Sequence, residues 1–405
     1  MALFSMKLTF LILLIIGLRF GYGQDLKKNS SVKADFELEL NGEYRYFYNQ
    51  GQFLGQKTHY PSIAIAPTYS LNWDNGYQNF TATGFFMADQ DAKRTYGDVR
   101  EFFYQKARNS WEFNVGLKKV FWGVAESNHL VDIINQSDAL KSFDGEQKLG
   151  QPMVQFSYYA PSMGTFDFFY LPYHRIRRFA GTRGRFRFST TMEDESLTYE
   201  SKQNEWHPDF SVRWKNYFGP VDLGLSYFKG NGREPYFEFD PSGNINAFYP
   251  LIDQVGLDLQ ITANALLLKF ESIYRDASDQ HFIAAVVGFE YTFSNIDGNG
   301  LDLGVIGEYL YDERDAFALS GLQNDMFYGS RLAFNDINDT AILLGGIVDL
   351  DTHTHLLTLE ASRRIANNLN MTLEARLFDG ISSQELFLLF FKQDSFLAIS
   401  FSKYF

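Results

Sequence analysis

The sequence predicts an all-β fold, a transmembrane antiparallel β-barrel of about 18 strands with short periplasmic turns and long extracellular loops. Three observations predict it. Apolar and polar residues alternate over most of the chain. Aromatic residues make up 17% of the chain although its mean hydropathy is only −0.23. Short and long connections follow one another. A barrel with a lipid-facing outside, a water-facing inside and aromatic girdles accounts for all three, and its partners would be outer-membrane lipid and lipopolysaccharide.

The N-terminal residues predict a secretory signal peptide. Lys7 precedes an apolar run from Leu8 to Leu18, and residues 21–23 supply the small residues of a cleavage site. A run of about 11 apolar residues is too short for a membrane-spanning helix, which needs about 20. We therefore assign 1–23 to a signal peptide and 24–405 to a single barrel domain.

Period-2 alternation defines the individual strands. In residues 35–48 one face carries Phe, Leu and Tyr, and the other carries Asp, Glu, Asn and Arg. Residues 301–310 and 369–377 divide in the same way, with Glu308 on the polar face of the first. A soluble sandwich would have to bury such charged rows in its core, which is costly.

The strand count follows from these runs and from the connections between them. Short turns are expected at residues 73–78, 107–110, 160–164, 217–220, 262–264, 335–339 and 366–368, and longer loops at about 122–150, 173–205, 230–250 and 311–325. Because single-chain bacterial barrels have even strand numbers, the apolar run 386–391 is assigned to an extracellular rim segment. Ser395–Phe405 is then the closing strand.

The closing strand places Leu397, Ile399, Phe401 and Phe405 on one face. It resembles the C-terminal targeting strand of Gram-negative outer-membrane barrels, whose final residue is aromatic. Lys403 departs from that pattern, because it occupies a position that is usually apolar. The resemblance implies that Phe405 is an assembly signal and that the barrel assembly machinery is a partner.

Residues 120–140, VFWGVAESNHLVDIINQSDAL, interrupt the alternation. We expect a short helix over 132–140 and, because Gly123 permits a sharp bend, a corner anchored by Trp122. The candidate residues for a pore constriction in this segment are Trp122, Glu126, His129, Asp132, Asn135 and Asp138.

Residues 116–143 resemble a stretch, G-[RK]-[QK]-x-x-x-W-G-x-x-[DE]…D-x-[IL]-N-P-x-D, of porin-like outer-membrane barrels of Gram-negative bacteria. This is a loose group that includes alginate-export-type proteins. Gln136 stands where the group has Pro, and residues 148–188 continue the similarity. The resemblance implies a barrel with a pore. In porins the corresponding loop folds back into the lumen, so we expect 123–140 to narrow it.

A second constellation is basic, and it consists of Arg175, Arg177, Arg178, Arg183, Arg185 and Arg187. If residues 183–188 form a strand, the last three arginines share one face at a spacing of about 7 Å. Such a row could face the acids of 126–138 across the lumen and attract carboxylate or phosphate groups. Two alternatives stay open, binding of lipopolysaccharide phosphates at the outer rim and pairing with the acids of 192–195.

Charge and motifs exclude several functions. The net charge of −13 disfavours a nucleic-acid partner, and the absence of cysteine excludes disulfides and Cys-based metal sites. Two histidines in residues 351–355 are read as surface residues, and no cofactor or metal is expected. The function predicted is passive diffusion of small solutes through the barrel. An outer-membrane enzyme or a surface adhesin is the alternative, and homo-oligomerisation is left open.

Overall fold

The computed structural model describes residues 32–192, 197–239, 245–277, 280–296, 298–315, 318 and 321–405. The expected signal peptide, 1–23, and most of the acidic stretch 192–195 lie outside the described residues. Among the described residues no helix is long and apolar enough to cross a membrane.

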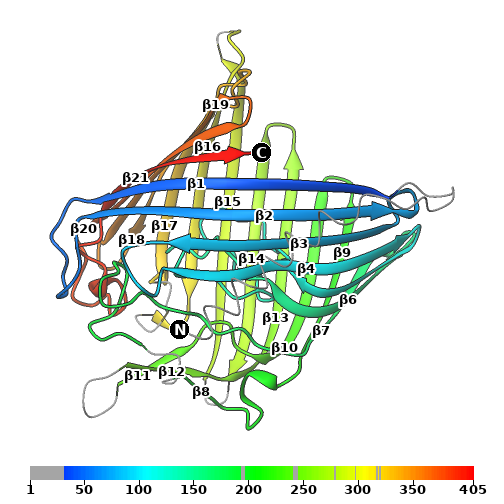
Figure 1. Ribbon diagram of the computed structural model, residues 1–405, viewed down its shortest axis with the longest axis horizontal. Coiled ribbons are helices and arrows are strands. Elements are labelled where there is room, and N and C mark those ends of the chain that lie inside the picture. Colours follow the sequence, from blue (N-terminus) through cyan, green and yellow to red (C-terminus); the bar gives the residue numbers. More distant parts are fainter. Residues whose placement is uncertain are drawn as a thin grey trace, which may run out of the picture.

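Eighteen strands form one closed antiparallel ring, which confirms the predicted fold and strand count. The strands of the ring are β1 (Lys33–Phe47), β2 (His59–Trp73), β3 (Gln78–Ala88), β4 (Tyr96–Arg108), β5 (Trp111–Lys118), β6 (Gln151–Ala160), β7 (Gly164–Leu171), β9 (Asp209–Phe218), β10 (Val221–Asn231), β13 (Leu251–Ala263), β14 (Leu266–Ala277), β15 (Gln280–Ile296), β16 (Leu301–Asp312), β17 (Asn324–Ala333), β18 (Ala341–Asp349), β19 (His355–Ala366), β20 (Leu369–Asp379) and β21 (Phe396–Tyr404). Each strand pairs with the next one in the ring, and β21 closes the ring on β1. In Figure 1, β1 to β4 cross the near wall while β13 to β16 run steeply behind them, as expected for tilted strands of a barrel.

The alternation seen in the sequence separates the outside of the barrel from its inside. In β14, Leu268 and Tyr274 are exposed, whereas Lys269, Glu271 and Arg275 are buried. The exposed face is apolar because it meets lipid. The polar face is buried, so other parts of the chain must cover it from within the barrel.

The two ends of the barrel differ. The connections at 74–77, 109–110, 161–163, 219–220, 264–265 and 367–368 are short and lie at one end, the turn end. Both ends of the ring-forming chain lie there too, because Leu38 and Phe405 exchange two backbone hydrogen bonds. The four long loops expected from the sequence lie at the opposite end, the loop end. The role of Phe405 as an assembly signal stays a prediction.

The loops carry little regular structure. A second sheet has three strands, β8 (Leu197–Tyr199), β11 (Tyr236–Phe239) and β12 (Ile245–Tyr249). This small sheet lies at the bottom of Figure 1. Among the described residues, the single-turn 3-10 helices include η1 (Asp74–Gly76), η3 (Asn204–Trp206) and η5 (Leu388–Phe390). The run 386–391 therefore lies outside the ring, as expected.

Two local expectations were wrong. Residues 132–140 form turns and an isolated bridge rather than a helix, and residues 183–188 form no strand. Phe186 has a φ of 54°, which ends any alternation there. In both segments side-chain bonds to other parts of the chain replace the regular backbone ladder, and no short-range period reports such bonds.

Gly116 of β5 lies very close to the backbone of the neighbouring strand β4. It has a φ of 131°, and a Cβ on it would collide with the Phe102 carbonyl oxygen of the neighbouring strand β4. We expect Gly116→Ala to lower the yield of folded barrel at least several-fold, because both the backbone strain and the collision oppose pairing. The measurement is the fraction of unheated protein with the mobility of the folded form in a denaturing gel. Gly42→Ala is the matched control, since a Cβ at Gly42 meets nothing within 4 Å. Equal yields for the two variants would contradict the argument.

Candidate functional site

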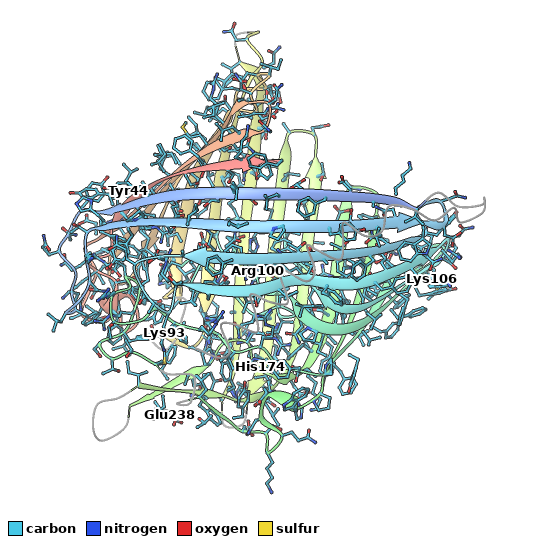
Figure 2. The ribbon with its side chains drawn as sticks, in the orientation of Figure 1. Tyr44, Lys93, Arg100, Lys106, His174 and Glu238 are labelled. Carbon is cyan, nitrogen blue, oxygen red and sulfur yellow. The ribbon has the colours of Figure 1, made fainter. Side chains whose placement is uncertain are left out.

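The site is built by residues 119–150, here named the crossing segment, which connect β5 to β6. The segment leaves the wall at β5 and contacts inward-facing side chains of β14, β16, β17 and β20. It also contacts β4, through Arg100, which Figure 2 labels on the near wall. Because β4 and β14 lie far apart around the ring, these contacts span the interior of the barrel.

Two wall carboxylates hold the backbone of the crossing segment. Glu271 on β14 accepts hydrogen bonds from the backbone N–H groups of Val124 (2.6 Å), Ala125 (2.9 Å) and Val131 (3.3 Å). Glu308 on β16 accepts them from Glu126 (2.7 Å) and Ser127 (2.8 Å). An irregular backbone inside a barrel has no ladder partners, so these carboxylates supply the acceptors that it would otherwise lack.

Apolar side chains of the barrel wall also pack against the crossing segment. Trp122, Val131, Ile133 and Ile134 are buried in one cluster with side chains from β6, β7, β10, β13, β14 and β15. The Arg213 guanidinium lies 4.8 Å from the Trp122 ring centroid, and Phe169 meets that ring edge to face. Part of the interior wall is therefore apolar, and it forms a hydrophobic core with the crossing segment.

Acids of the crossing segment pair with arginines of three different strands. Asp138 bonds to Arg100 and to the Tyr96 hydroxyl (2.6 Å) of β4. Glu126 lies 2.6 Å from Arg331 of β17, and Asp144 lies 2.8 Å from Arg376 of β20. Charge pairs thus hold the segment at strands that contribute no side chain to the Trp122 cluster.

The remaining candidate residues stabilise the segment internally. The Asn135 side chain accepts a bond from the Val120 N–H and donates to the Lys118 and Leu149 carbonyls. Asp132 lies 3.2 Å from Lys148; burial raises the pKa of Asp132 despite that partner.

His129 lies 3.2 Å from Glu146. Burial opposes protonation of His129, but the bond to Glu146 outweighs it, so the pKa of the imidazole is raised.

The six arginines of 175–187 do not face the acids of the crossing segment as one row. Arg185 pairs with Asp394 (2.7 Å), and Arg187 donates to the carbonyls of Phe188 and Leu54. The backbone carbonyl of Arg183 accepts a bond from the Tyr60 hydroxyl. The expected ladder of arginines 183, 185 and 187 is therefore wrong, because the backbone carrying it is not extended.

The other three arginines lie against the crossing segment and its wall. Arg175 pairs with Asp98 and donates to the Gly150 carbonyl, and the Arg178 guanidinium lies 4.8 Å from the Tyr96 ring. Arg177 donates to the Gln136 side chain (3.0 Å). Gln136, the departure from the porin-like pattern, thus ties the two loops together. The role of any of these arginines in a pore stays a prediction.

A partly buried charge network continues from Arg177 toward the wall. Glu234 lies 2.9 Å from Arg275 and 3.0 Å from Arg314. Burial alone would raise the pKa of Glu234, but Arg314 and Arg275 outweigh it and lower that pKa to about 2. Glu234 therefore stays ionised, and it fixes the loop between β10 and β11 against β14.

Two cavities lie beside the crossing segment. The larger, about 560 Å³, is bounded by Glu126, Asp144, Arg376 and the aromatic residues of the loop end. The smaller, about 410 Å³, lies toward the turn end and is bounded by Glu112, Trp122, Asp167, Arg213 and Lys215. Both are lined by charged and apolar groups together.

Several of these residues were not among the candidate site residues of the sequence analysis, namely Glu271, Glu308, Arg100, Arg331 and Arg376. All lie on inward faces of strands, and the alternation had already placed Glu308 on a polar face. The period could therefore have given their direction, but not their partners. Among the described residues no group of three or more His, Asp or Glu side chains has the arrangement of a metal site.

Comparisons with known proteins agree with this architecture. No family model and no curated protein matches the sequence. A BenF-like porin of Pseudomonas fluorescens Pf-5 superposes with a TM-score of 0.54 at 10% identity, over 92% of this chain and 98% of the other. The chain has the fold of an outer-membrane porin. OccD3 (OpdP) of Pseudomonas aeruginosa superposes with a TM-score of 0.52 at 10% identity, over 92% and 91% of the chains.

The bonds to Glu271 and Glu308 predict that the bonded backbone amides are protected from hydrogen exchange, and that removing either carboxylate reduces this protection. We expect Glu271→Ala and Glu308→Ala to speed amide hydrogen exchange of residues 124–127 and 131 by about 10- to 100-fold, since a hydrogen bond to a charged group contributes about 1.5–3 kcal/mol. Glu290→Ala is the control, because Glu290 faces the same interior but bonds to Lys269 and Arg331. Exchange that is equally slow in all three variants would contradict the anchoring role.

Proposed function

We propose that this chain is a porin-like channel, through which small solutes diffuse passively across the outer membrane, and that residues 123–140 narrow its lumen. The closed 18-stranded ring and its polar inward faces support the proposal. A ring of this size is wide enough to leave an aqueous interior. The observation that carries it is the bonding of the crossing segment to Glu271 and Glu308 on the opposite wall.

The path for solutes would run off the barrel axis. The crossing segment covers β6 to β16 with its apolar cluster and its backbone bonds. Along β19 to β21 the inward-facing side chains are mostly hydroxyl or charged groups and are less buried. Water and solutes would therefore follow that wall, past the contact between Asp144 and Arg376.

Charge at this contact is unbalanced. Three carboxylates lie around the single Arg376 guanidinium, those of Asp144 (2.8 Å), Glu360 (2.7 Å) and Glu374 (3.1 Å). The excess of negative charge would attract cations and repel anions, because charges beside a narrow path are only partly screened over a Debye length of about 8 Å. The proposed channel therefore prefers small cations over anions. For an enzyme or an adhesin we find no favouring observation in the part of the chain that the structure describes.

The proposed function is tested by single-channel recording in a planar bilayer. We expect discrete conductance steps from the purified barrel, and larger steps after deletion of residues 125–140, because the deletion removes the narrowing. A deletion variant with the parental conductance would contradict the narrowing. A folded parental barrel that conducts no ions would contradict the channel itself.

The charge argument is tested by reversal potentials under a salt gradient. We expect Glu360→Gln with Glu374→Gln to lower the ratio of cation to anion permeability by about twofold or more, because two charges are lost beside the path. Asp253→Asn is the control, since this acid pairs with Lys229 on the exposed face. A reversal potential that is the same in the double variant and in the parent would show that Arg376 and its three acids do not set the ion selectivity of the channel.

A further inference from the structure

Three carboxylates meet at the loop end without a cation. Asp325 and Asp349 are direct partners in the register of β17 and β18, and both are buried. Glu385, from the loop between β20 and β21, is buried against them. We name this group the carboxylate triad. Each of its three members comes from a different part of the chain, namely β17, β18 and the loop after β20.

The bonds to the triad come from neutral donors. The Gln323 side chain donates to Asp349 (2.6 Å), the Thr352 hydroxyl donates to Glu385 (2.8 Å), and the backbone N–H of Asp351 donates to Asp349 (2.8 Å). Within the described residues no Lys, Arg or His makes an ion pair with the triad, although salt bridges are numerous elsewhere in the barrel.

The other titratable groups at this rim do not neutralise the triad either. The Asp351 carboxylate accepts a bond from the Asn324 side chain. His353 lies in the turn after β18, where its backbone N–H donates to the Asp349 carbonyl, and His355 begins β19 opposite Val348. Neither imidazole contacts a triad carboxylate in the described structure.

Three ionised carboxylates cannot be buried together at little cost. Burial raises the pKa of Glu385, and the neighbouring Asp349 raises it further. A proton shared between Glu385 and Asp349 converts repulsion into a carboxyl–carboxylate hydrogen bond, as in other close carboxyl pairs. The three carboxylates can therefore stay buried together at low cost only when at least one of them is protonated.

Glu385 belongs to a loop that covers the larger cavity. Glu385 precedes η5, whose Leu388 is buried and borders that cavity together with Phe387 and Phe391. The Phe391 ring lies 5.1 Å from that of Phe143 in the crossing segment, and Phe387 lies 5.8 Å from Phe188. Residues 380–395, the rim loop, thus close the cavity at the loop end.

We propose that the carboxylate triad is a proton-operated latch, which holds the rim loop over the larger cavity when protonated and releases it when the proton leaves. The sign follows from the direction of the shift. A carboxyl group whose pKa is raised in the latched state stabilises that state at low pH, and the stabilisation is lost as the pH rises through the raised pKa. Entry to the channel is therefore easier at alkaline pH, an effect on current that rests on the proposed function.

The structural part of the proposal is tested by thiol labelling, which needs no channel activity. The chain has no cysteine, so Leu388→Cys and Leu386→Cys each introduce a single thiol. Leu388 is 2% exposed and Leu386 is 50% exposed, so the ratio of their maleimide labelling rates reports release of the rim loop and cancels the ionisation of the thiol. We expect this ratio to rise with pH by up to about tenfold per unit, the limit for one proton.

Glu385→Gln decides whether the triad is responsible. The amide keeps the bonds to Thr352 and Asp349 but cannot lose a proton, so the labelling ratio should stay low at every pH. Asp253→Asn is the matched control, because it removes a carboxylate outside the triad and the crossing segment, paired with Lys229 on the exposed face, and should leave the rise unchanged. A flat ratio in the parent, or the same rise in Glu385→Gln, would overturn the proposal.

Two further results separate the latch from its rivals. If EDTA releases the rim loop at low pH and added Ca²⁺ restores it, a divalent cation rather than a proton holds the triad, and the proposal fails. In bilayer recordings the conductance should rise with pH in the parent and stay constant in Glu385→Gln. A parent that never conducts contradicts the proposed channel and leaves the labelling ratio to decide the latch.

Discussion

The structure depends on one constraint, that polar backbone groups placed inside a barrel need partners that no strand ladder provides. Glu271 and Glu308 meet this constraint, because together they accept five backbone N–H bonds from residues 124–131. A charged acceptor holds such donors more strongly than a neutral one. Without these two carboxylates the crossing segment would keep its apolar contacts but lose the bonds that fix its path across the lumen.

The rest of the interior follows from this path. On one side the segment completes a hydrophobic core with Trp122 and Val131, and on the other it reaches Arg100, Arg331 and Arg376 through its own acids. The Asp138–Arg100 pair is buried, so removing one member costs more than the pair contributes, because the remaining charge is left without a partner. The arrangement is therefore specific to one position of the segment, and in the proposed channel it leaves the path for solutes beside β19 to β21.

The period-2 pattern predicted the strands of the ring, because lipid outside and water inside impose it on every strand. The even strand number of single-chain barrels then gave the count of about 18, and the lengths of the connections gave the four long loops. It also marked residues 120–140 as different. It could not predict the partners of Asp138 or Glu126, which lie on strands distant in sequence. The strand expected at Arg183 to Phe188 failed for the same reason. The alternation there is real, but side-chain bonds from Arg185 to Asp394 and to the Asn49 carbonyl, and from Arg187 to the Leu54 carbonyl, hold the segment instead of a strand ladder. Long-range bonds of this kind leave no local signal.

The central claim, that the crossing segment lies against the far interior wall, is tested most directly by a disulfide. A Cβ on Gly256 of β13 would lie 3.6 Å from the Val131 Cβ, within the range of about 3.5–4.5 Å that disulfides need. In this cysteine-free chain, Val131→Cys with Gly256→Cys should form an intramolecular disulfide under mild oxidation, seen as a gel shift that reductant reverses. Val131→Cys with Gly42→Cys should form none. A folded barrel in which the first pair stays reduced would contradict the account.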